Sequence, residues 1–249
     1  MKSVNWFKLR LIFLFVSLTC FSVEAAEPAQ FAKANKLYED GDFEAARALY
    51  EQIVRSGDFS ADLFYNLGNT NFRLGDVGKA ALNFRRAIEL QPNHAEAKAN
   101  LEFVRVAAKA KIATPPAFED FFPAVSESSW TISAAVFGWS SLFFFVSVIF
   151  ARRRATLWFG AICCVLLCVY SLGGLFLQNS THDLGVVVAS ETEARLAPAT
   201  TARLAERLPA ASEIQMLATR GKWTLCELPN GTRAWVPTDG IAPVRPAQS

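Results

Sequence analysis

The side chains of this protein that are best placed for chemistry are amides. Asn35 and Asn69 lie 34 residues apart, and the same interval separates Asn66 from Asn100. An asparagine amide donates and accepts hydrogen bonds at once, so a row of such amides can hold the backbone of an extended peptide. With Arg73 as a nearby cation, we predict that these residues bind a segment of a partner protein. Alternatively, the asparagines are polar surface residues or amides that join packed helices.

Residues that could catalyse a reaction are scarce. His94 and His182 are the only histidines, and neither stands in a nucleophile or metal-binding motif. The sequence also has no phosphate-binding loop, paired carboxylates or cysteine–histidine set placed for catalysis. We therefore expect no enzymatic activity, no metal and no cofactor, and we interpret His94 as a surface residue of a first helical turn. The net charge of +2 argues against a nucleic-acid partner, because binding nucleic acid requires phosphate neutralisation.

The segments that carry the asparagines repeat at the same interval. Four pairs of residues are 34 positions apart: Gly41 and Gly75, Asp42 and Asp76, Ala46 and Ala80, and Tyr50 and Phe84. This interval is the period of tetratricopeptide repeats, which are pairs of antiparallel helices. In the second unit, the large, small and proline positions of the pattern hold Phe64, Leu67, Gly68, Ala80, Phe84, Ala87 and Pro92. The sequence thus resembles two repeats, at about 27–60 and 61–94, although Asn71 stands where an aromatic residue is usual.

A further helix is predicted after the second repeat. Asn93 is its expected N-cap, and one helical stripe carries Ala97, Leu101, Val104 and Ala108. This helix would cap the array and complete an α-helical domain over residues 26–111. In tetratricopeptide proteins the first helix of each unit lines a concave groove, which would contain all four asparagines. The subfamily that clamps carboxyl termini is a poor match, because it expects a lysine at Phe31 and basic residues at Glu96 and Asn100.

Composition and the N-terminus indicate an exported membrane protein. Hydrophobic residues make up 52% of the 249 residues, which is more than an ordinary soluble protein carries. Residues 1–25 combine Lys2, Lys8 and Arg10 with a short apolar run that ends in small residues. We interpret this stretch as a signal peptide that is cleaved after Ala25, or after the next residue.

Two apolar stretches predict a transmembrane hairpin. Residues 130–150 and 157–177 contain no charged side chain and are long enough to cross a bilayer. The loop 151–156 between them carries Arg152, Arg153 and Arg154, which the positive-inside rule places on the cytoplasmic side. Both soluble regions would then lie on the other side of the membrane, in agreement with the signal peptide.

Small residues indicate how the two spans pack. Gly160, Cys164 and Cys168 recur every four residues, so one helix face could approach Ala134 and Gly138 closely. The predicted linker 112–129 precedes this hairpin. Its phenylalanines would lie in the membrane interface or cover the base of the repeats.

The C-terminal residues 184–245 predict a small all-β barrel. About five strands are expected, at 186–189, 213–217, 223–228, 232–237 and near 241. Asn230-Gly231 predicts a hairpin with a type I′ turn. The stretches "RGKW", "PNG" and "AWVP" resemble a bacterial SH3-like domain, and Trp223 and Trp235 would form an aromatic groove for peptides or peptidoglycan, or else pack in the core. Cys226 is expected to be a small apolar filler on a strand.

The order of signal peptide, repeats, hairpin and SH3-like tail resembles the BatE-type proteins of bacterial aerotolerance operons. This resemblance implies an inner-membrane scaffold with both soluble domains in the periplasm. It would work beside von Willebrand factor A-type membrane proteins and a MoxR-type ATPase in envelope stress resistance. Two functions follow: a scaffold that holds a protein partner in the repeat groove, or an envelope sensor that binds peptidoglycan or peptides through the SH3-like domain.

Overall fold

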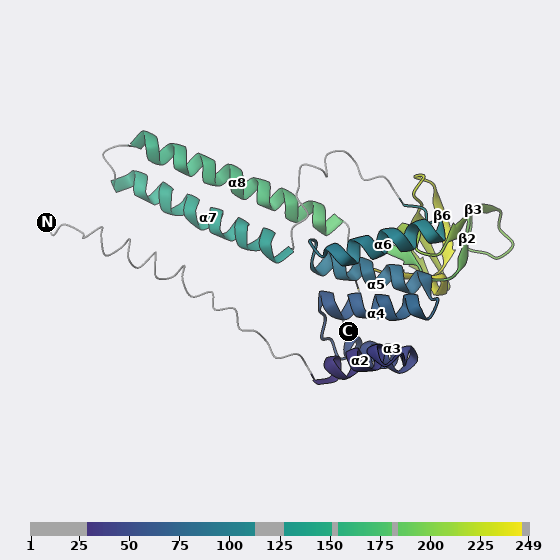
Figure 1. The fold of residues 1–249 in the computed structure, drawn as a ribbon. Helices are drawn as coiled ribbons and strands as arrows, with labels where there is room; N and C mark the ends of the chain where they lie inside the picture. Colours follow the sequence, from purple (N-terminus) through teal and green to yellow (C-terminus); the bar gives the residue numbers. More distant parts are fainter. Residues whose placement is uncertain (1–28, 113–126, 151–153, 181–183, 246–249) are drawn as a thin grey trace.

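The computed structural model describes residues 29–112, 127–150, 154–180 and 184–245. The predicted signal peptide and most of the predicted linker lie outside these residues, as do Arg152 and Arg153. Figure 1 shows a stack of helices against a β-sheet, with two long helices extending away from them.

Five helices form the stack: α2 (Ala29–Glu39), α3 (Phe43–Arg55), α4 (Ala61–Arg73), α5 (Val77–Leu90) and α6 (Ala95–Ala108). Their ends follow local chemistry, since Asp42 and Ser60 accept hydrogen bonds from first-turn N–H groups of α3 and α4. Gly41 and Gly75 adopt positive φ in the turns that precede α3 and α5. The predicted helix pairs are present, and so is the helix predicted after the second repeat.

Close contact between paired helices explains the small residues of the repeat. A Cβ atom added to Gly68 of α4 would lie 2.7 Å from the Phe84 ring of α5. Leu67 and Phe84 are both buried, and Tyr50 of α3 shares a buried cluster with Leu63 and Leu67 of α4. The predicted role of Gly68 in letting α4 and α5 approach is therefore confirmed.

His94 differs from its predicted role. It is the N-cap of α6 in place of Asn93, because its Nδ1 accepts a hydrogen bond from the Ala97 N–H at 3.3 Å. Its ring packs on that of Tyr65, with centroids 4.8 Å apart, and the residue is only 8% exposed. The interpretation of His94 as a surface residue was therefore wrong.

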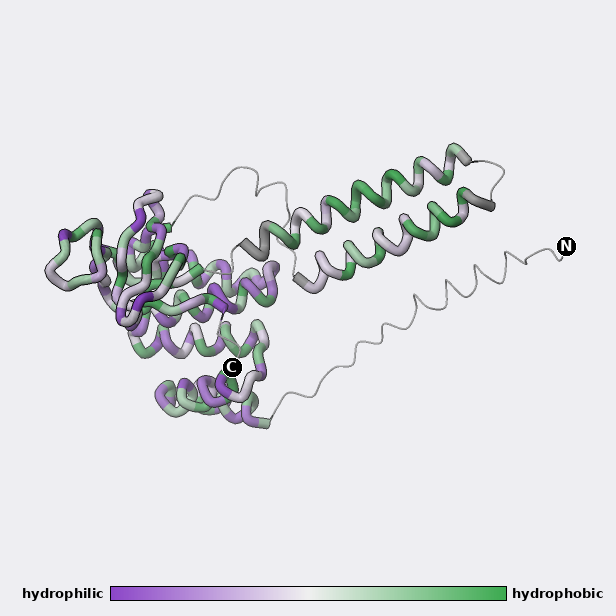
Figure 2. Tube along the Cα trace, turned by 180° about the vertical axis from the view of Figure 1, so that it is seen from behind, coloured by the Kyte–Doolittle hydropathy of each residue, from purple (hydrophilic) through white to green (hydrophobic). Residues whose placement is uncertain are grey.

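The two predicted apolar helices are confirmed as α7 (Glu127–Phe150) and α8 (Arg154–Ser180), each starting three residues earlier than predicted. Their stretches Ser128–Val148 and Ala155–Phe176 are long and apolar enough to cross a membrane. Figure 2 shows this hydrophobic character along both helices.

Small and polar side chains contribute to the contacts between α7 and α8, beside aromatic pairs such as Trp130 with Tyr170. Ser133 and Ser171 are joined through their Oγ atoms at 3.0 Å, and the Cys168 thiol donates to the Ala134 carbonyl at 3.5 Å. A Cβ on Gly138 would lie 3.8 Å from the Cys168 sulfur. The predicted approach of Cys168 to Ala134 and Gly138 is confirmed.

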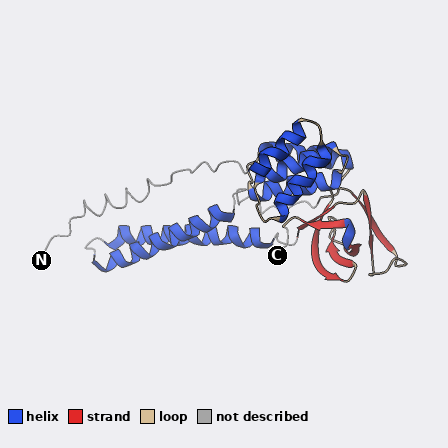
Figure 3. Ribbon diagram, turned by 90° about the horizontal axis from the view of Figure 1, so that it is seen from below, coloured by secondary structure: helices blue, strands red, loops and turns tan. Residues whose placement is uncertain are grey.

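The C-terminal region is one antiparallel sheet of seven strands (Figure 3). The strands are β1 (Leu184–Val187), β2 (Glu191–Arg195), β3 (Leu204–Pro209), β4 (Glu213–Arg220), β5 (Trp223–Glu227), β6 (Arg233–Pro237) and β7 (Ile241–Pro243). Their order is β3-β2-β6-β5-β4-β1-β7. Its main core contains Val187, Leu208, Ile214, Cys226 and Val236.

Strands β2 and β3 were not predicted. Glu191, Glu193 and Arg195 alternate with the buried Thr192 and Ala194, so the inward side chains are small and the alternation is weak. Pairing with β3 and with β6 determines the conformation of this segment. Such long-range pairing overrides a weak local pattern.

The turn between β5 and β6 also differs from the predicted type I′ turn. Gly231 has φ +78°, whereas Asn230 does not have positive φ. Leu228 donates its N–H to the Thr232 carbonyl, and Gly231 donates to that of Leu228. The hairpin therefore has a three-residue loop that ends on a left-handed glycine.

The sheet packs directly on α5 and α6, and Figures 1 and 3 show it beside the helical stack from two directions. Val186 and Val244 share a buried cluster with Phe84, Leu101 and Val104. The sheet therefore covers the last apolar face of the stack, where a second helix of a third repeat would otherwise lie. The sequence had left open whether these two regions touch.

Candidate functional site

The four predicted asparagines are hydrogen-bonded to one another across neighbouring first helices. Asn66 of α4 donates from Nδ2 to Asn35 Oδ1 of α2 at 3.0 Å, and Asn100 of α6 donates to Asn69 Oδ1 of α4 at 2.9 Å. Tyr50 also donates its hydroxyl to Asn35 Oδ1 at 2.6 Å. These amides therefore join packed helices, which was one of the two interpretations of the sequence.

The Asn69–Asn100 pair also retains hydrogen-bonding capacity. This contact uses one N–H of Asn100 and one lone pair of Asn69. In the described part of the chain, no other residue pairs with the Asn69 N–H groups or with the Asn100 carbonyl oxygen. Since both residues are only half-buried, the pair presents a donor and an acceptor side by side, as a bound peptide backbone requires.

An apolar cluster continues this face by one helical turn. The rings of Phe72 on α4 and Phe103 on α6 meet edge to face, with centroids 5.8 Å apart. Phe103 is 61% exposed and Val106 is 70% exposed, so much of this apolar surface faces solvent. We did not predict these residues from sequence. Phe72 and Phe103 are 31 residues apart, as are the two hydrogen-bonded asparagine pairs, Asn35–Asn66 and Asn69–Asn100.

Arg73 lies at the end of α4, and its side chain is exposed. Its guanidinium carbon lies 4.5 Å from the ring centroid of Phe43, the first residue of α3. Within the described ranges, no carboxylate lies within ion-pair distance of Arg73. Stacking on an aromatic face leaves the N–H edge of a guanidinium available to an anion.

Trp223 and Trp235 lie on one face of the sheet. Trp223 pairs with Pro237 and Leu225 pairs with Trp235 across β5 and β6, so these side chains share a side. Both tryptophans are half-buried, whereas Thr224, Cys226, Ala234 and Val236 between them are buried. The two indoles are therefore on the face opposite the buried core of the sheet.

Charged residues join the sheet to the stack. Glu213 of β4 forms ion pairs with Arg85 of α5 and Arg105 of α6, and each of these three side chains is at most 25% exposed. Arg86 donates to the backbone carbonyls of Pro243 and Val244, both at 2.9 Å. Its burial lowers the pKa of Arg86 to about 10. This polar seam fixes how the sheet sits on α5 and α6.

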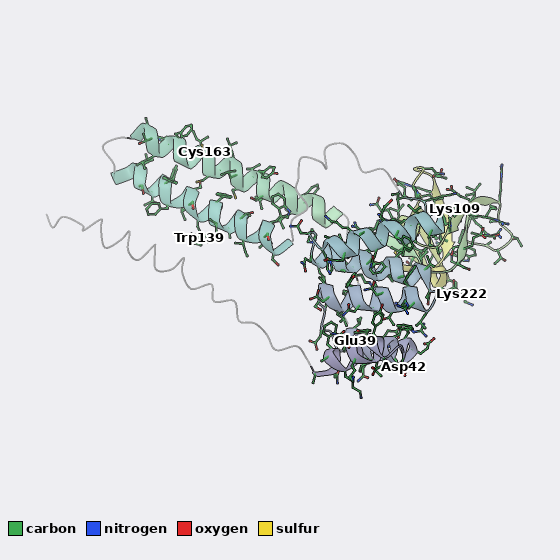
Figure 4. All side chains as sticks on the ribbon, in the orientation of Figure 1. Glu39, Asp42, Lys109, Trp139, Cys163 and Lys222 are labelled. Atoms are coloured by element: carbon green, nitrogen blue, oxygen red, sulfur yellow. The ribbon has the colours of Figure 1, made fainter. Side chains whose placement is uncertain are left out.

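The backbone and a close glycine contact complete the seam. The Glu213 N–H donates to the Lys111 carbonyl at 3.0 Å, just beyond Lys109, which Figure 4 labels at the end of α6. Gly78 of α5 lies so close to Val188 that an added Cβ would be 2.4 Å from the Val188 oxygen. A cleft of about 300 Å³ opens beside this contact.

The described residues hold no group of three or more His, Cys, Asp or Glu side chains that could bind a metal ion. Cys226 is fully buried on β5, and burial raises the pKa of its thiol to about 12. Its predicted role as an apolar filler is confirmed.

Comparison with known proteins agrees with the geometry of the stack. Residues 31–95 match the tetratricopeptide repeat family. Over 64 residues, the chain is 34% identical to Tetratricopeptide repeat protein 8 of Caenorhabditis elegans. These aligned residues make up 26% of this chain and 13% of that relative. The chain thus spans a small part of the relative's length. The predicted repeats are confirmed, and residues 31–95 contain tetratricopeptide repeats, which indicate a scaffold for protein–protein interaction.

Proposed function

We propose that this protein is a membrane-anchored scaffold that holds a segment of a protein partner on the α2, α4 and α6 face of its repeats. The observation that carries this proposal is the hydrogen-bonded pair Asn69–Asn100, next to the exposed Phe103 and Val106. The amides offer paired donors and acceptors to a backbone, and the apolar cluster offers a surface for a side chain.

The docked sheet supports a topology with both soluble regions on one side of a membrane. Residues before the hairpin, such as Phe84, share a buried cluster with residues after it, such as Val186. If α7 and α8 span a bilayer, they must cross it twice to leave these residues in contact. The arginines at 152–154 then face the cytoplasm, and the repeats and the sheet are periplasmic.

The wider system is proposed on the resemblance to BatE-type proteins. In that setting, the sheet is an SH3-like domain and the scaffold works in envelope stress resistance with a MoxR-type ATPase. The partner on the repeat face is a von Willebrand factor A-type membrane protein. The protein itself carries out no reaction and needs no cofactor.

A photo-crosslinking residue at Val106 in living cells tests the scaffold function, because 70% of this side chain is exposed. The matched control places the same residue at Arg55 of α3, whose side chain is 68% exposed. We expect an adduct with a von Willebrand factor A-type membrane protein from position 106 alone. Equal adducts from both positions, or none from position 106, would contradict the proposal.

Cysteine labelling tests the topology. Cys226 is buried and is unsuitable, so new cysteines are needed at the exposed Lys33 and Lys222 and at Arg153. A reagent that cannot cross the inner membrane should label positions 33 and 222 in cells with a permeabilised outer membrane. Labelling of position 153 under the same conditions would refute the orientation.

A second candidate function rests on the shared face of Trp223 and Trp235. Two half-buried indoles flanking Leu225 offer a surface on which a sugar ring or peptide can stack. The protein would then sense peptidoglycan or peptides through its sheet. Co-sedimentation of the detergent-solubilised chain with peptidoglycan, lost on Trp235→Ala, would favour this function, and sedimentation unaffected by that change would exclude this face.

A further inference from the structure

The proposed scaffold function leaves the chemistry of the bound segment unspecified. We infer that the repeat face takes an extended peptide in which a bulky apolar side chain lies near a carboxylate. This inference rests on the proposed function, because it names the chemical class of the segment held at the same face. The apolar cluster and Arg73 carry it.

The apolar half of the inference follows from exposure. Phe103 and Val106 are one helical turn apart on α6, and Phe103 contacts Phe72 of α4. These three side chains form one cluster that remains 39% to 70% exposed. A bulky aliphatic or aromatic side chain placed on the cluster would remove apolar surface from water, which is the main driving force for such contacts.

The charged half follows from the environment of Arg73. Several other cations of the repeats pair with a carboxylate four residues away, such as Lys36 with Asp40 and Arg55 with Glu51. Arg73 instead lies over the Phe43 ring, and no carboxylate of the described residues pairs with it. Its guanidinium is thus held by stacking while its N–H groups remain able to bind a carboxylate.

The amide pair favours one backbone conformation for the segment beside these two contacts. Asn69 lies on α4 one turn before Arg73, and its partner Asn100 lies on α6 one turn before Phe103. A backbone that crosses the pair can accept from Asn69 and donate to Asn100, which favours an extended chain. The carboxylate is either an acidic side chain or a carboxyl terminus, since both offer Arg73 the same oxygen pair.

Selection from a random peptide library displayed on phage tests this inference on the full chain in detergent. The wild-type protein should enrich peptides that combine a large apolar residue with Asp or Glu. Chemical synthesis of the best peptide with a free or an amidated carboxyl terminus then separates the two sources of the carboxylate. Arg73→Glu should weaken binding of that peptide about 10-fold or more, the loss of one charge-assisted contact.

Three further variants make the result specific. Phe103→Ser should remove the preference for an apolar residue, whereas Leu90→Ser, on α5 and also exposed, should leave it unchanged. Arg55→Glu is the matched control for Arg73→Glu. All four positions are exposed, and circular dichroism should confirm that each variant is folded.

The outcomes separate the inference from the function on which it rests. The carboxylate half would be overturned if the enriched peptides lose affinity with Phe103→Ser but show no preference for acidic residues or no response to Arg73→Glu. The proposed scaffold function would then still stand. Peptides without an apolar preference that still respond to Arg73→Glu would overturn the apolar half. Peptides that bind without any response to Phe103→Ser or Arg73→Glu would overturn the proposed function together with the inference, and so would the absence of any enrichment.

Discussion

Gly78 gives the sharpest test of the contact between the helices and the sheet. In a helix that touches nothing, replacing glycine by alanine stabilises by about 0.5–1 kcal/mol, because glycine loses more backbone entropy on folding. Here the added Cβ would lie 2.4 Å from the carbonyl oxygen of Val188 and 2.6 Å from its Cα. These are backbone atoms that no rotamer change can move.

The expected cost follows from this overlap. Overpacking of a close contact costs about 1–3 kcal/mol, and the strain can be relieved only if the sheet moves away from α5. The gain in helix propensity is the same whether or not the sheet is docked, so docking should weaken by about 1–3 kcal/mol, which raises the open fraction about 5- to 150-fold. The reporter is the Glu213 amide, which donates across the seam to the Lys111 carbonyl at 3.0 Å.

Hydrogen exchange measured by mass spectrometry on the full chain reports that opening. Gly78→Ala should speed exchange of the Glu213 amide, while Gly75→Ala serves as the matched control. Gly75 has φ +79° and an added Cβ there would contact nothing, so alanine should strain the turn by about 1 kcal/mol without touching the sheet. A Gly78→Ala protein with unchanged Glu213 protection and a higher melting temperature would refute the docked arrangement.

Four further predictions concern the seam, the core and the hairpin. Glu213→Ala leaves Arg85 and Arg105 without their shared carboxylate and should lower the free energy of unfolding, measured by thermal unfolding, by about 3 kcal/mol. Glu227→Ala, at an exposed ion pair, is the control and should lower it by less than about 1 kcal/mol. Asn71→Leu should raise the melting temperature, because the buried Asn71 Oδ1 has no hydrogen-bond partner in the structure. Leaving such an oxygen unpaired destabilises the folded state by about 1–3 kcal/mol, which the change to leucine removes. A lower melting temperature would show that this oxygen has a hydrogen-bond partner. Burial raises the pKa of Cys226 from 9.0 to about 12, so between these pH values the folded state holds a proton that the unfolded state releases. The free energy of unfolding should therefore fall between pH 9 and 12 by up to about 1.4 kcal/mol per pH unit. Cys226→Ala should remove that part of the pH dependence in alkaline unfolding curves. Joining Ile112 to Leu184 through a short Gly–Ser linker should give a water-soluble protein with one cooperative unfolding transition, and two separate transitions would contradict a shared core.

The sequence was most informative where structure is local and periodic. The 34-residue interval and the uncharged apolar runs predicted α2 to α6 and the two long helices, because each signal lies within one helix or one repeat. It was least informative for β2, whose inward residues Thr192 and Ala194 are small. That strand depends on partners in β3 and β6, which a local pattern cannot specify.

Predictions for the candidate site divided in the same way. The spacing of the asparagines placed them at equivalent positions of successive helices, and the structure brings Asn69 and Asn100 together. Spacing did not reveal that they bond to each other, because the register of α6 against α4 is set by packing. The contacts of Arg85 and Arg86 were likewise not predicted from sequence, because their partners lie more than 120 residues away in the sheet.

The position of the hairpin in the chain gives the shared core a consequence for assembly. The chain leaves the seam at Lys111, whose carbonyl binds Glu213, and returns at Gly185, which pairs with the adjacent Ile214. The hairpin is thus an insertion into one folded unit, and the apolar face of α5 and α6 stays uncovered until β1 arrives. If one span failed to cross the membrane, β1 would lie on the wrong side and Phe84 and Leu101 would remain without their cover. If α7 and α8 span a membrane as proposed, docking of the sheet makes completion of the repeats conditional on both crossings, and the stability of the proposed binding face then depends on the topology of the hairpin.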